Sequence, residues 1–179
     1  MNKFFGHLKT VMIHKYWVFH YCCKIGMPIV GLTHDLSKFS PIEFWESVKY
    51  YNGKVSPIVM CKKDKGYSEA WQHHKGRNPH HYEYWIDNLD KGGVPIKMPY
   101  RYAAELICDY LAAGKAYNRN KSYRQDIYKQ ELEWWKKKQP EVATSMHKDI
   151  QRFITEVFSR LAKGEKLDKK LLKTVYNKY

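Results

Sequence analysis

Cysteine is scarce in this sequence, and its positions fit neither a metal site nor a disulfide framework. Four cysteines occur among 179 residues, Cys22, Cys23, Cys61 and Cys108, and no two of them form a CxxC pair. Secreted disulfide-rich domains and thiolate zinc sites both depend on regular cysteine spacing. We therefore exclude both classes and expect reduced thiols, buried as small apolar side chains.

Long hydrophobic runs are also missing. Residues 1–27 contain apolar patches, but Lys3, Lys9, Lys15 and Lys24 interrupt them. A membrane-spanning helix needs about 20 consecutive apolar residues, and a signal peptide needs a shorter uninterrupted apolar segment. We therefore expect a cytoplasmic protein with no membrane association.

Acidic residues are few relative to basic ones. The chain has 32 Lys and Arg against 18 Asp and Glu, which gives a net charge of +14. Such an excess attracts anionic partners over long distances. Many of the lysines fall in 134–139 and 164–179, where we expect solvated helix faces rather than a nucleic-acid platform. Charge alone does not choose between a small anionic substrate and nucleic acid, and it does not predict an oligomeric state. We expect a small, phosphate-containing anionic substrate as the partner, with nucleic acid possible but not favoured.

Strand signals are weak, because the sequence contains no long alternating segment bounded by hairpin turns. Hydrophobic residues make up 44% of the chain, and they recur every three or four positions. We expect an all-α fold of one domain spanning 1–179. Its catalytic core would cover about 8–120 and its C-terminal helices about 121–179.

Helix start and stop signals divide the chain into segments. Two capping boxes, Ser40 with Glu43 and Ser122 with Gln125, mark helix starts, and Ser68 is a candidate cap for another. The segments expected to be helical are 3–25, 28–37, a helix from 41, 68–74, a helix from 79, 100–117, a helix ending near 138, 146–163 and a basic C-terminal helix. The expected irregular segments are a corner at 75–77, a loop at 89–99 and a loop at 52–66, the last a candidate flap over the site.

Seven side chains able to bind metal ions occur in an ordered series: His14, His34, Asp35, His74, His80, His81 and Asp109. The adjacent pair His34 and Asp35 is unusual, because neighbouring residues on a helix point about 100° apart. Such a pair works best when the carboxylate bridges two ions and the imidazole binds one of them. The series therefore predicts a site for two metal ions.

The donor set consists only of imidazole and carboxylate groups, which suits divalent Mn, Fe, Co, Ni or Zn. Without thiolates, the set indicates a catalytic centre rather than structural zinc. The expected assignment places Asp35 as the bridge, with His14, His34 and Asp109 on one ion and His74, His80 and His81 on the other. Glu83 and Glu105 are candidates to accept hydrogen bonds from the ligand histidines.

The remaining histidines and aromatic residues have simpler interpretations. We assign no site role to His7, His20 or His147. His73 is expected to support the site or face solvent, and the choice of ligands stays open among His73, His74, His80 and His81. Core packing is favoured over base stacking for five aromatic residues at helical spacing: Trp71, Tyr82, Trp85, Trp134 and Trp135.

The order H…HD…H…H…D resembles the HD superfamily of metal-dependent phosphohydrolases, and HDLSK at 34–38 resembles the HDIGK segment of its HD-GYP phosphodiesterase branch. The chain is also similar, over about residues 8–160, to an uncharacterised family of HD-like proteins of bacteria and phages. The matching segments are HKYWVF, GMPIVGLTHDLSKFSPIEF, AWQHHKGRNPHHYEYW and MPYRYAAELICDYLAAGKAY.

The resemblance implies an HD-type helical bundle and a ligand set. His14, His34, Asp35 and Asp109 would be the central ligands, with His74, His80 and His81 in the place of the extra histidines of two-metal members. It also implies that Lys38 lies near a substrate phosphate. The glycine–tyrosine–proline signature of the HD-GYP branch is absent, and RNPHHYEY stands at 77–84.

Together these features predict a metal-dependent phosphohydrolase, a phosphomonoesterase or phosphodiesterase, that acts on a nucleotide or other small phosphate ester. The expected catalytic residues are Asp35, Lys38 and Glu83, and the expected substrate-binding residues are Lys38, Arg77 and Asn78. Two alternatives stay open. One is an HD-type di-iron oxygenase, because the ligand types do not separate iron from manganese. The other is a non-catalytic basic module that binds nucleic acid or protein.

Overall fold

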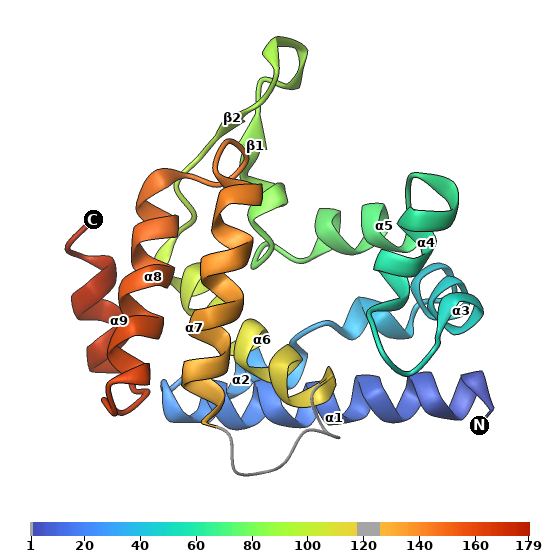
Figure 1. The fold of residues 1–179 in the computed structure, drawn as a ribbon, viewed down its shortest axis with the longest axis horizontal. Helices are drawn as coiled ribbons and strands as arrows, with labels where there is room; N and C mark the ends of the chain where they lie inside the picture. The colour runs from blue at the N-terminus through green and yellow to red at the C-terminus, as the bar shows by residue number, and fades with distance from the viewer. Residues whose placement is uncertain (1, 118–125) are drawn as a thin grey trace.

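The computed structural model describes residues 2–117 and 126–179, and helices dominate this part of the chain (Figure 1). The first elements are α1 (Lys3–Lys24), α2 (Pro28–Thr33), η1 (Leu36–Phe39), α3 (Pro41–Tyr50), α4 (Pro57–Lys65), α5 (Glu69–Arg77) and η2 (Tyr82–Trp85). The later ones are β1 (Ile86–Asp87), η3 (Leu89–Lys91), β2 (Val94–Pro95), α6 (Tyr100–Tyr117), α7 (Ile127–Lys138), η4 (Gln139–Val142), α8 (Lys148–Ala162) and α9 (Lys169–Tyr176). The all-α class is confirmed, because the described residues add only the two-stranded antiparallel β1–β2 sheet.

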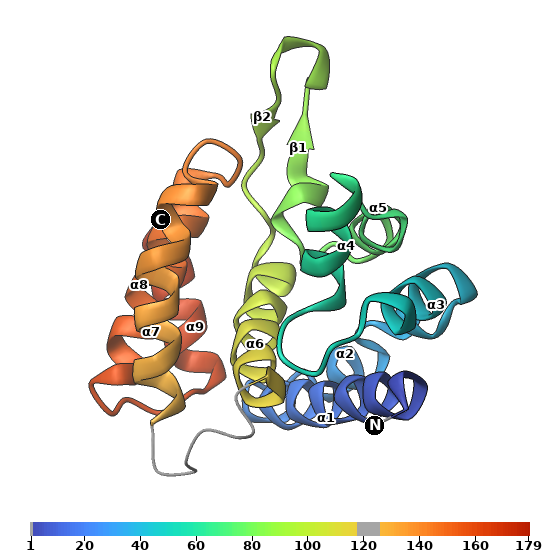
Figure 2. The ribbon, with the colours of Figure 1, turned by 45° about the vertical axis from the view of Figure 1, so that its right-hand side comes forward.

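Helix α6 lies at the centre of the fold, between two groups of helices (Figure 2). The C-terminal helices α7, α8 and α9 lie on one side of it, and α3, α4 and α5 lie on the other, while α1 runs beneath. The apolar core fills the C-terminal side, where Trp135, Phe153 and Phe158 are fully buried. Burial of such side chains stabilises each by about 1.5–3 kcal/mol relative to exposure. This core anchors one face of α6 and leaves another face for the site.

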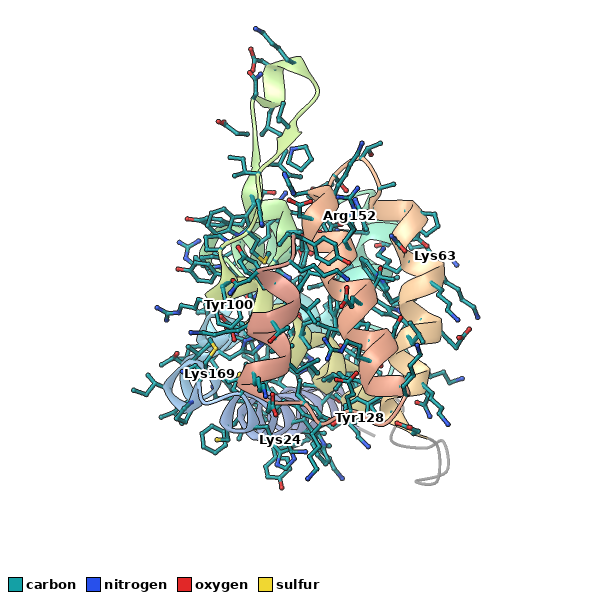
Figure 3. All side chains as sticks on the ribbon, turned by 90° about the vertical axis from the view of Figure 1, so that its left-hand side faces the viewer. Lys24, Lys63, Tyr100, Tyr128, Arg152 and Lys169 are labelled. Atoms are coloured by element: carbon teal, nitrogen blue, oxygen red, sulfur yellow. The ribbon has the colours of Figure 1, made fainter. Side chains whose placement is uncertain are left out.

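The basic residues of the C-terminal third lie mainly on the outside of the molecule. Figure 3 shows Arg152 and Lys169 on the outer faces of α8 and α9, and both residues are exposed. Lys136 on α7 is exposed as well and pairs with Glu133 one turn earlier. These lysines and arginines are therefore on solvated helix faces, as the sequence predicts.

The corner that carries His34 and Asp35 differs in detail from the prediction. Helix α2 ends at Thr33 rather than at 37, and His34 caps it. Asp35 then adopts a left-handed conformation with φ 55°, and η1 follows directly. A non-glycine residue in this region costs about 1 kcal/mol or more, and aspartate is among the residues that tolerate it best. The predicted tight corner at a helix end is confirmed.

Three local predictions on the α4–α6 side were wrong. Residues 52–66 are not one loop, because Pro57–Lys65 form α4, with Pro57 and Cys61 buried. Residues 75–77 are not a corner, since α5 continues to Arg77. No α-helix restarts at 79; the chain instead makes the single 3₁₀ turn η2 and the β1–β2 hairpin. The hairpin turn uses left-handed residues at Asn88, Gly92 and Gly93.

The capping predictions were partly right. Ser68 caps α5 by accepting a hydrogen bond from Trp71 N at 3.0 Å, as expected. Helix α3 starts after Ser40 as predicted, but Ser40 makes no side-chain cap, and Glu43 instead binds histidines. The Ser122–Gln125 capping box lies outside the described residues, within which α7 is capped by Asp126.

The structure can be compared with the sequence predictions for membrane-spanning helices and for the cysteines. None of the described helices combines the length and apolarity that crossing a membrane requires. All four cysteines are free thiols, and Cys22, Cys61 and Cys108 are buried while Cys23 is exposed. The three buried cysteines therefore act as small packing residues, as expected, whereas Cys23 does not.

Candidate metal centre

All seven predicted metal ligands come together in one cluster on the side of α6 that faces α3 and α5. They come from the middle of α1, the α2–η1 corner, the last turns of α5, the turn before η2, and the centre of α6. Two groups of four residues in this cluster could each hold a metal ion, and both groups contain Asp35. The side chains are thus arranged around one shared carboxylate.

The first group consists of His14, His34, Asp35 and Asp109, all buried. Each offers one ligand atom, and these atoms lie within 4.8 Å of one another. His14 Nε2 lies 3.1 Å from Asp109 Oδ1, and His34 Nε2 lies 3.2 Å from Asp35 Oδ2. The two imidazoles and two carboxylates therefore converge on one point.

The second group consists of Asp35, His74, His80 and His81. His74 Nε2 and His80 Nε2 lie 3.3 Å and 3.4 Å from Asp35 Oδ1. Asp35 thus directs Oδ2 toward the first group and Oδ1 toward the second, which is the arrangement of a bridging carboxylate. A third combination, His34, His80 and Glu105, also has ligand spacing, but Glu105 already bonds the Nδ1 atoms of both histidines.

The buried nitrogen atoms of the cluster fit a cation. The Nε2 atoms of His14, His34, His80 and His81 are buried without a hydrogen-bond partner. The carboxylate oxygens of Asp35 also lack hydrogen bonds of regular geometry, although Lys38 Nζ lies 2.7 Å from Oδ2. More than about 90% of buried polar groups in proteins are hydrogen-bonded, so this concentration of unpaired acceptors needs an explanation. Coordination of a metal ion would supply one, because the ligand atoms of the cluster have the spacing to hold it.

Two glutamates orient the histidines from outside. Glu105 Oε1 accepts from His34 Nδ1 at 2.8 Å and lies 3.3 Å from His80 Nδ1. Glu43 Oε2 accepts from His74 Nδ1 at 2.7 Å. A proton held on Nδ1 leaves the Nε2 lone pair free to bind a metal ion. Glu105 takes the supporting role predicted for it, whereas Glu43 was expected only to cap a helix.

His73 and Glu83 lie apart from the ligand positions. Glu43 Oε1 accepts from His73 Nδ1 at 2.6 Å, so His73 supports the site through the same glutamate that orients His74. Glu83 has a buried Oε2 without a partner, and burial raises the pKa of its carboxyl. Lys62 and Lys75 partly offset this shift, and no hydrogen bond joins Glu83 to a histidine of the cluster in the described part of the chain.

The electrostatic setting keeps the cluster ready to bind cations. Burial alone would raise the pKa of Asp35, but His34 and Lys38 hold it well below its usual range. Burial is likewise outweighed at Asp109, whose pKa is lowered by His14 and His34. Burial also lowers the pKa of His81 well below its usual range. Both carboxylates are therefore ionised and His81 is neutral at neutral pH, as metal ligands must be. His34 differs, because Asp35, Asp109 and Glu105 outweigh its burial and raise its pKa well above its usual range, so a bound metal ion would displace a proton from this imidazole.

The predicted substrate-binding residues have different locations. Lys38 lies at the cluster, paired with Asp35, and lines a neighbouring cavity. Asn78 instead ties the end of α5 to η1, since its Nδ2 donates to Ser37 Oγ at 2.9 Å and to the His74 carbonyl at 2.8 Å. Arg77 is exposed and does not line the cavity. Of these three residues, Lys38 alone is placed to reach a ligand at the cluster.

A cavity of about 260 Å³ adjoins the cluster between α1, α3, α4, α5, α6 and α7. Its polar lining includes His14, His74, His81, Asp109 and Lys38. The rest of the lining is largely apolar and aromatic, with contributions from Trp71, Tyr110 and Trp134. The candidate metal centre therefore adjoins a cavity large enough for a small organic molecule.

Sequence reasoning missed two kinds of residue in this cavity. His7 was assigned no role, yet it lines the cavity with 6% exposure and a buried, unpartnered Nδ1. Its position two helical turns before His14 was the available signal. Trp134 was expected in the core, but it is 41% exposed and lines the cavity, whereas Trp135 is a true core residue with 0% exposure. The remaining predicted core aromatics, Tyr82 and Trp85, pack against the apolar core, and Trp71 lines the cavity.

Comparison with known proteins places the chain in a family but assigns it no activity. Residues 3–160 match the model of a "Family of unknown function (DUF5662)". No curated protein and no solved structure matches the chain. The match ends within α8, so it includes every residue of the cluster and the cavity. The chain belongs to this family of unknown function, DUF5662.

Proposed function

We propose that this protein is a metal-dependent phosphohydrolase that acts on small phosphate esters through a two-metal His/Asp centre. The observation that carries the proposal is the sharing of Asp35 by two groups of ligands, nearly all buried, that border a cavity. A pair of bound divalent ions would supply an activated water and would neutralise phosphoryl oxygens. Catalytic sites of this kind hold their ions with nitrogen and oxygen ligands and leave positions open.

The chain's own residues provide the remaining functions of such a site. Lys38 borders the cavity beside Asp35 and is the point charge best placed to bind a phosphoryl oxygen. Burial opposes protonation of this lysine, but Asp35 and Asp109 raise its pKa, so it stays cationic. Glu43 and Glu105 keep the histidine rings in position. Together, these residues bind and orient an anion at the inner end of the cavity.

The cavity also supports a small substrate over a nucleic-acid platform. The cluster residues are almost all buried, and the cavity beside them lies between six helices and not on an open face. A nucleic-acid groove would need an open basic surface beside the reactive groups. Since imidazole and carboxylate ligands suit iron as well as manganese, an oxygen-dependent di-iron enzyme is the second candidate.

Metal analysis and activity measurements test the proposal together. Protein purified without added metal or chelator is analysed for ions per chain and assayed on a panel of phosphate monoesters and diesters. We expect about two ions of Mn, Co, Ni or Zn and metal-dependent hydrolysis. Asp35→Ala should lose both, because it removes the shared carboxylate, whereas Asp90→Ala on the exposed hairpin should keep both.

The same measurement separates the alternatives. Two iron atoms per chain without phosphatase activity would favour the oxygenase. A metal-free protein that does not gain activity when metal is added would favour a binding module. Full activity in Asp35→Ala would contradict a two-metal mechanism outright.

A further inference from the structure

The cavity beside the cluster has two chemically different ends. Helix α1 lines it with His7, Thr10, Val11 and His14, which lie on one face of the helix. His7 and His14 are two turns apart, or about 10 Å along the helix axis. His14 belongs to the candidate metal centre, and His7 lies at the remote end. A ligand that spans the cavity therefore meets the cluster at one end and His7 at the other.

The positive charge on the lining is concentrated at the inner end. Lys38 is the only lysine or arginine among the described residues that line the cavity. It lies 2.7 Å from Asp35 Oδ2 and thus marks the cluster end. One phosphate group can be bound there by the lysine and the metal ligands. Among the described lining residues no second lysine or arginine is available for another phosphate, so the part of the cavity that they form away from Lys38 suits an uncharged organic group.

Aromatic side chains from three helices form part of the cavity wall. Trp71 comes from α5, Tyr110 from α6 and Trp134 from α7. The rings of Tyr110 and Trp134 are in edge contact, with centroids 4.9 Å apart and an interplanar angle of 69°. Trp134 is 41% exposed, so it stands at the edge of the cavity and solvent. Such a wall favours a flat apolar ring over a flexible polar chain.

His7 supplies an unused hydrogen-bonding group at the remote end. Its side chain is 6% exposed, and Nδ1 is buried without a partner. The surroundings, chiefly through burial and further through Lys38, lower its pKa to about 4. His7 is therefore neutral at neutral pH and can bond an uncharged polar group. A buried polar atom without a partner is costly, which gives a ligand that pairs with it an advantage.

We propose that the cavity accepts a phosphate monoester whose organic part is a flat aromatic ring with an uncharged hydrogen-bonding group remote from the phosphate. Trp134 and His7 are its specificity-determining residues. This assignment rests on the proposed phosphohydrolase function for the position of the phosphate. The volume of about 260 Å³ is just below the usual range for drug-sized ligands, which fits a monoester smaller than a dinucleotide.

Binding of three phosphonates tests this assignment without relying on hydrolysis. Methylphosphonate, phenylphosphonate and 4-carbamoylphenylphosphonate share one head group and differ by a ring and then by an amide. Their dissociation constants are measured by calorimetry on manganese-loaded protein under nitrogen. We expect the ring to tighten binding about tenfold and the amide to tighten it about tenfold again.

Four variants show which residue is responsible for each of the two gains in affinity. Trp134→Ala should abolish the gain from the ring, and His7→Leu should abolish the gain from the amide. His7→Gln should restore part of the second gain, because it returns a polar group to this position. Trp45→Ala is the matched control, since Trp45 is 59% exposed on α3 and does not line the cavity. Metal content and melting temperature of each variant show that the cluster and the fold are intact.

Equal binding of the three phosphonates, or a ladder of affinities that Trp134→Ala and His7→Leu leave unchanged, would overturn the assignment. Hydrolysis of phenyl phosphate is assayed on the same preparations. A correct affinity ladder without hydrolysis would reject the phosphohydrolase proposal and keep the cavity assignment. Hydrolysis of phenyl phosphate together with equal binding of the three phosphonates would reject the cavity assignment and keep the phosphohydrolase proposal.

Discussion

Helix α6 separates two regions built on opposite physical principles. Toward α7, α8 and α9, it contributes Ala103, Ile107 and Leu111 to an apolar core without exposed surface. Toward the α2–η1 corner, it contributes Glu105 and Asp109, both buried, to a cluster of histidines. The same helix therefore stabilises the fold with one face and holds polar groups with another.

The two regions differ in what their burial does to stability. Apolar burial is favourable by roughly 25 cal/mol for each Å² removed from water. Burial of a carboxylate is unfavourable unless hydrogen bonds or opposite charges compensate for it. In the cluster, Glu105 is compensated by His34 and His80, but four imidazole nitrogens are left without partners. The C-terminal region thus provides stability that the metal-free cluster does not.

The largest expected effect is on the apolar side. Phe158→Ala removes a side chain with 0% exposure and should lower the free energy of unfolding by about 3–5 kcal/mol. Denaturation in urea measures it, with Phe5→Ala, a change at 64% exposure, as the control. The folded fraction should keep its metal content. A loss of metal affinity as large as the loss of stability would show that the two regions are not separable.

The apolar side also contains one buried carboxyl group, that of Glu131, which can be compared with the carboxyls of the cluster. Glu131 on α7 packs so closely against α6 that a Cβ on Gly114 would overlap its Oε1 atom. No cation pairs with it among the described residues, and burial, with a contribution from Asp109, raises its pKa from 4.5 to about 8. The carboxyls of the cluster, which have histidine partners, shift the opposite way.

Because the pKa of Glu131 is raised and those of the cluster carboxyls are lowered, they are expected to change the free energy of unfolding in opposite directions as pH rises. Because the unfolded chain releases the Glu131 proton near pH 4.5 and the folded chain near pH 8, this residue lowers stability as pH rises between those values. Glu131→Gln should remove that fall and stabilise the protein at pH 9 by a few kcal/mol, with little change at pH 4.5. Unfolding measured across pH, with Glu133→Gln on the same helix as the control, checks this. An equal effect at both pH values would refute it.

The smallest expected effect is on the cluster side. Glu105→Gln weakens the support of both His34 and His80 and should lower metal affinity about 10- to 100-fold. Competition with a chelating dye measures the affinity, and Glu141→Gln, at an exposed side chain, is the control. The metal-free variant should unfold at nearly the wild-type denaturant concentration. Unchanged metal affinity would remove Glu105 from the site.

The members of the cluster were predictable because ligand chemistry depends on residue type. His14, the His34–Asp35 pair and Asp109 stand out by their order along the chain, and the structure brings them within ligand distance. Local periodicity likewise predicts α1 and α6 closely. Helix propensity and amphipathic spacing are properties of neighbouring residues, so they can be read without knowing the fold.

The errors arise where structure depends on distant contacts. Residues 57–65 carry few strong helix signals, yet Pro57 and Cys61 are buried and α4 forms against α3. Glu43 has the position of a capping residue but reaches the α5 histidines instead. Burial and long-range pairing override weak local preferences, which is why these segments were misassigned.

The sequence by itself determined the helical class, the reduced cysteines and the residue types that could bind metal, because each follows from composition or short-range spacing. Only the tertiary structure decided that Asp35 is shared, that Glu43 supports His74, and that His7 and Trp134 enclose a cavity. Those relations join helices far apart in the chain. Helix packing sets them, and packing depends on the shape and burial of many side chains at once.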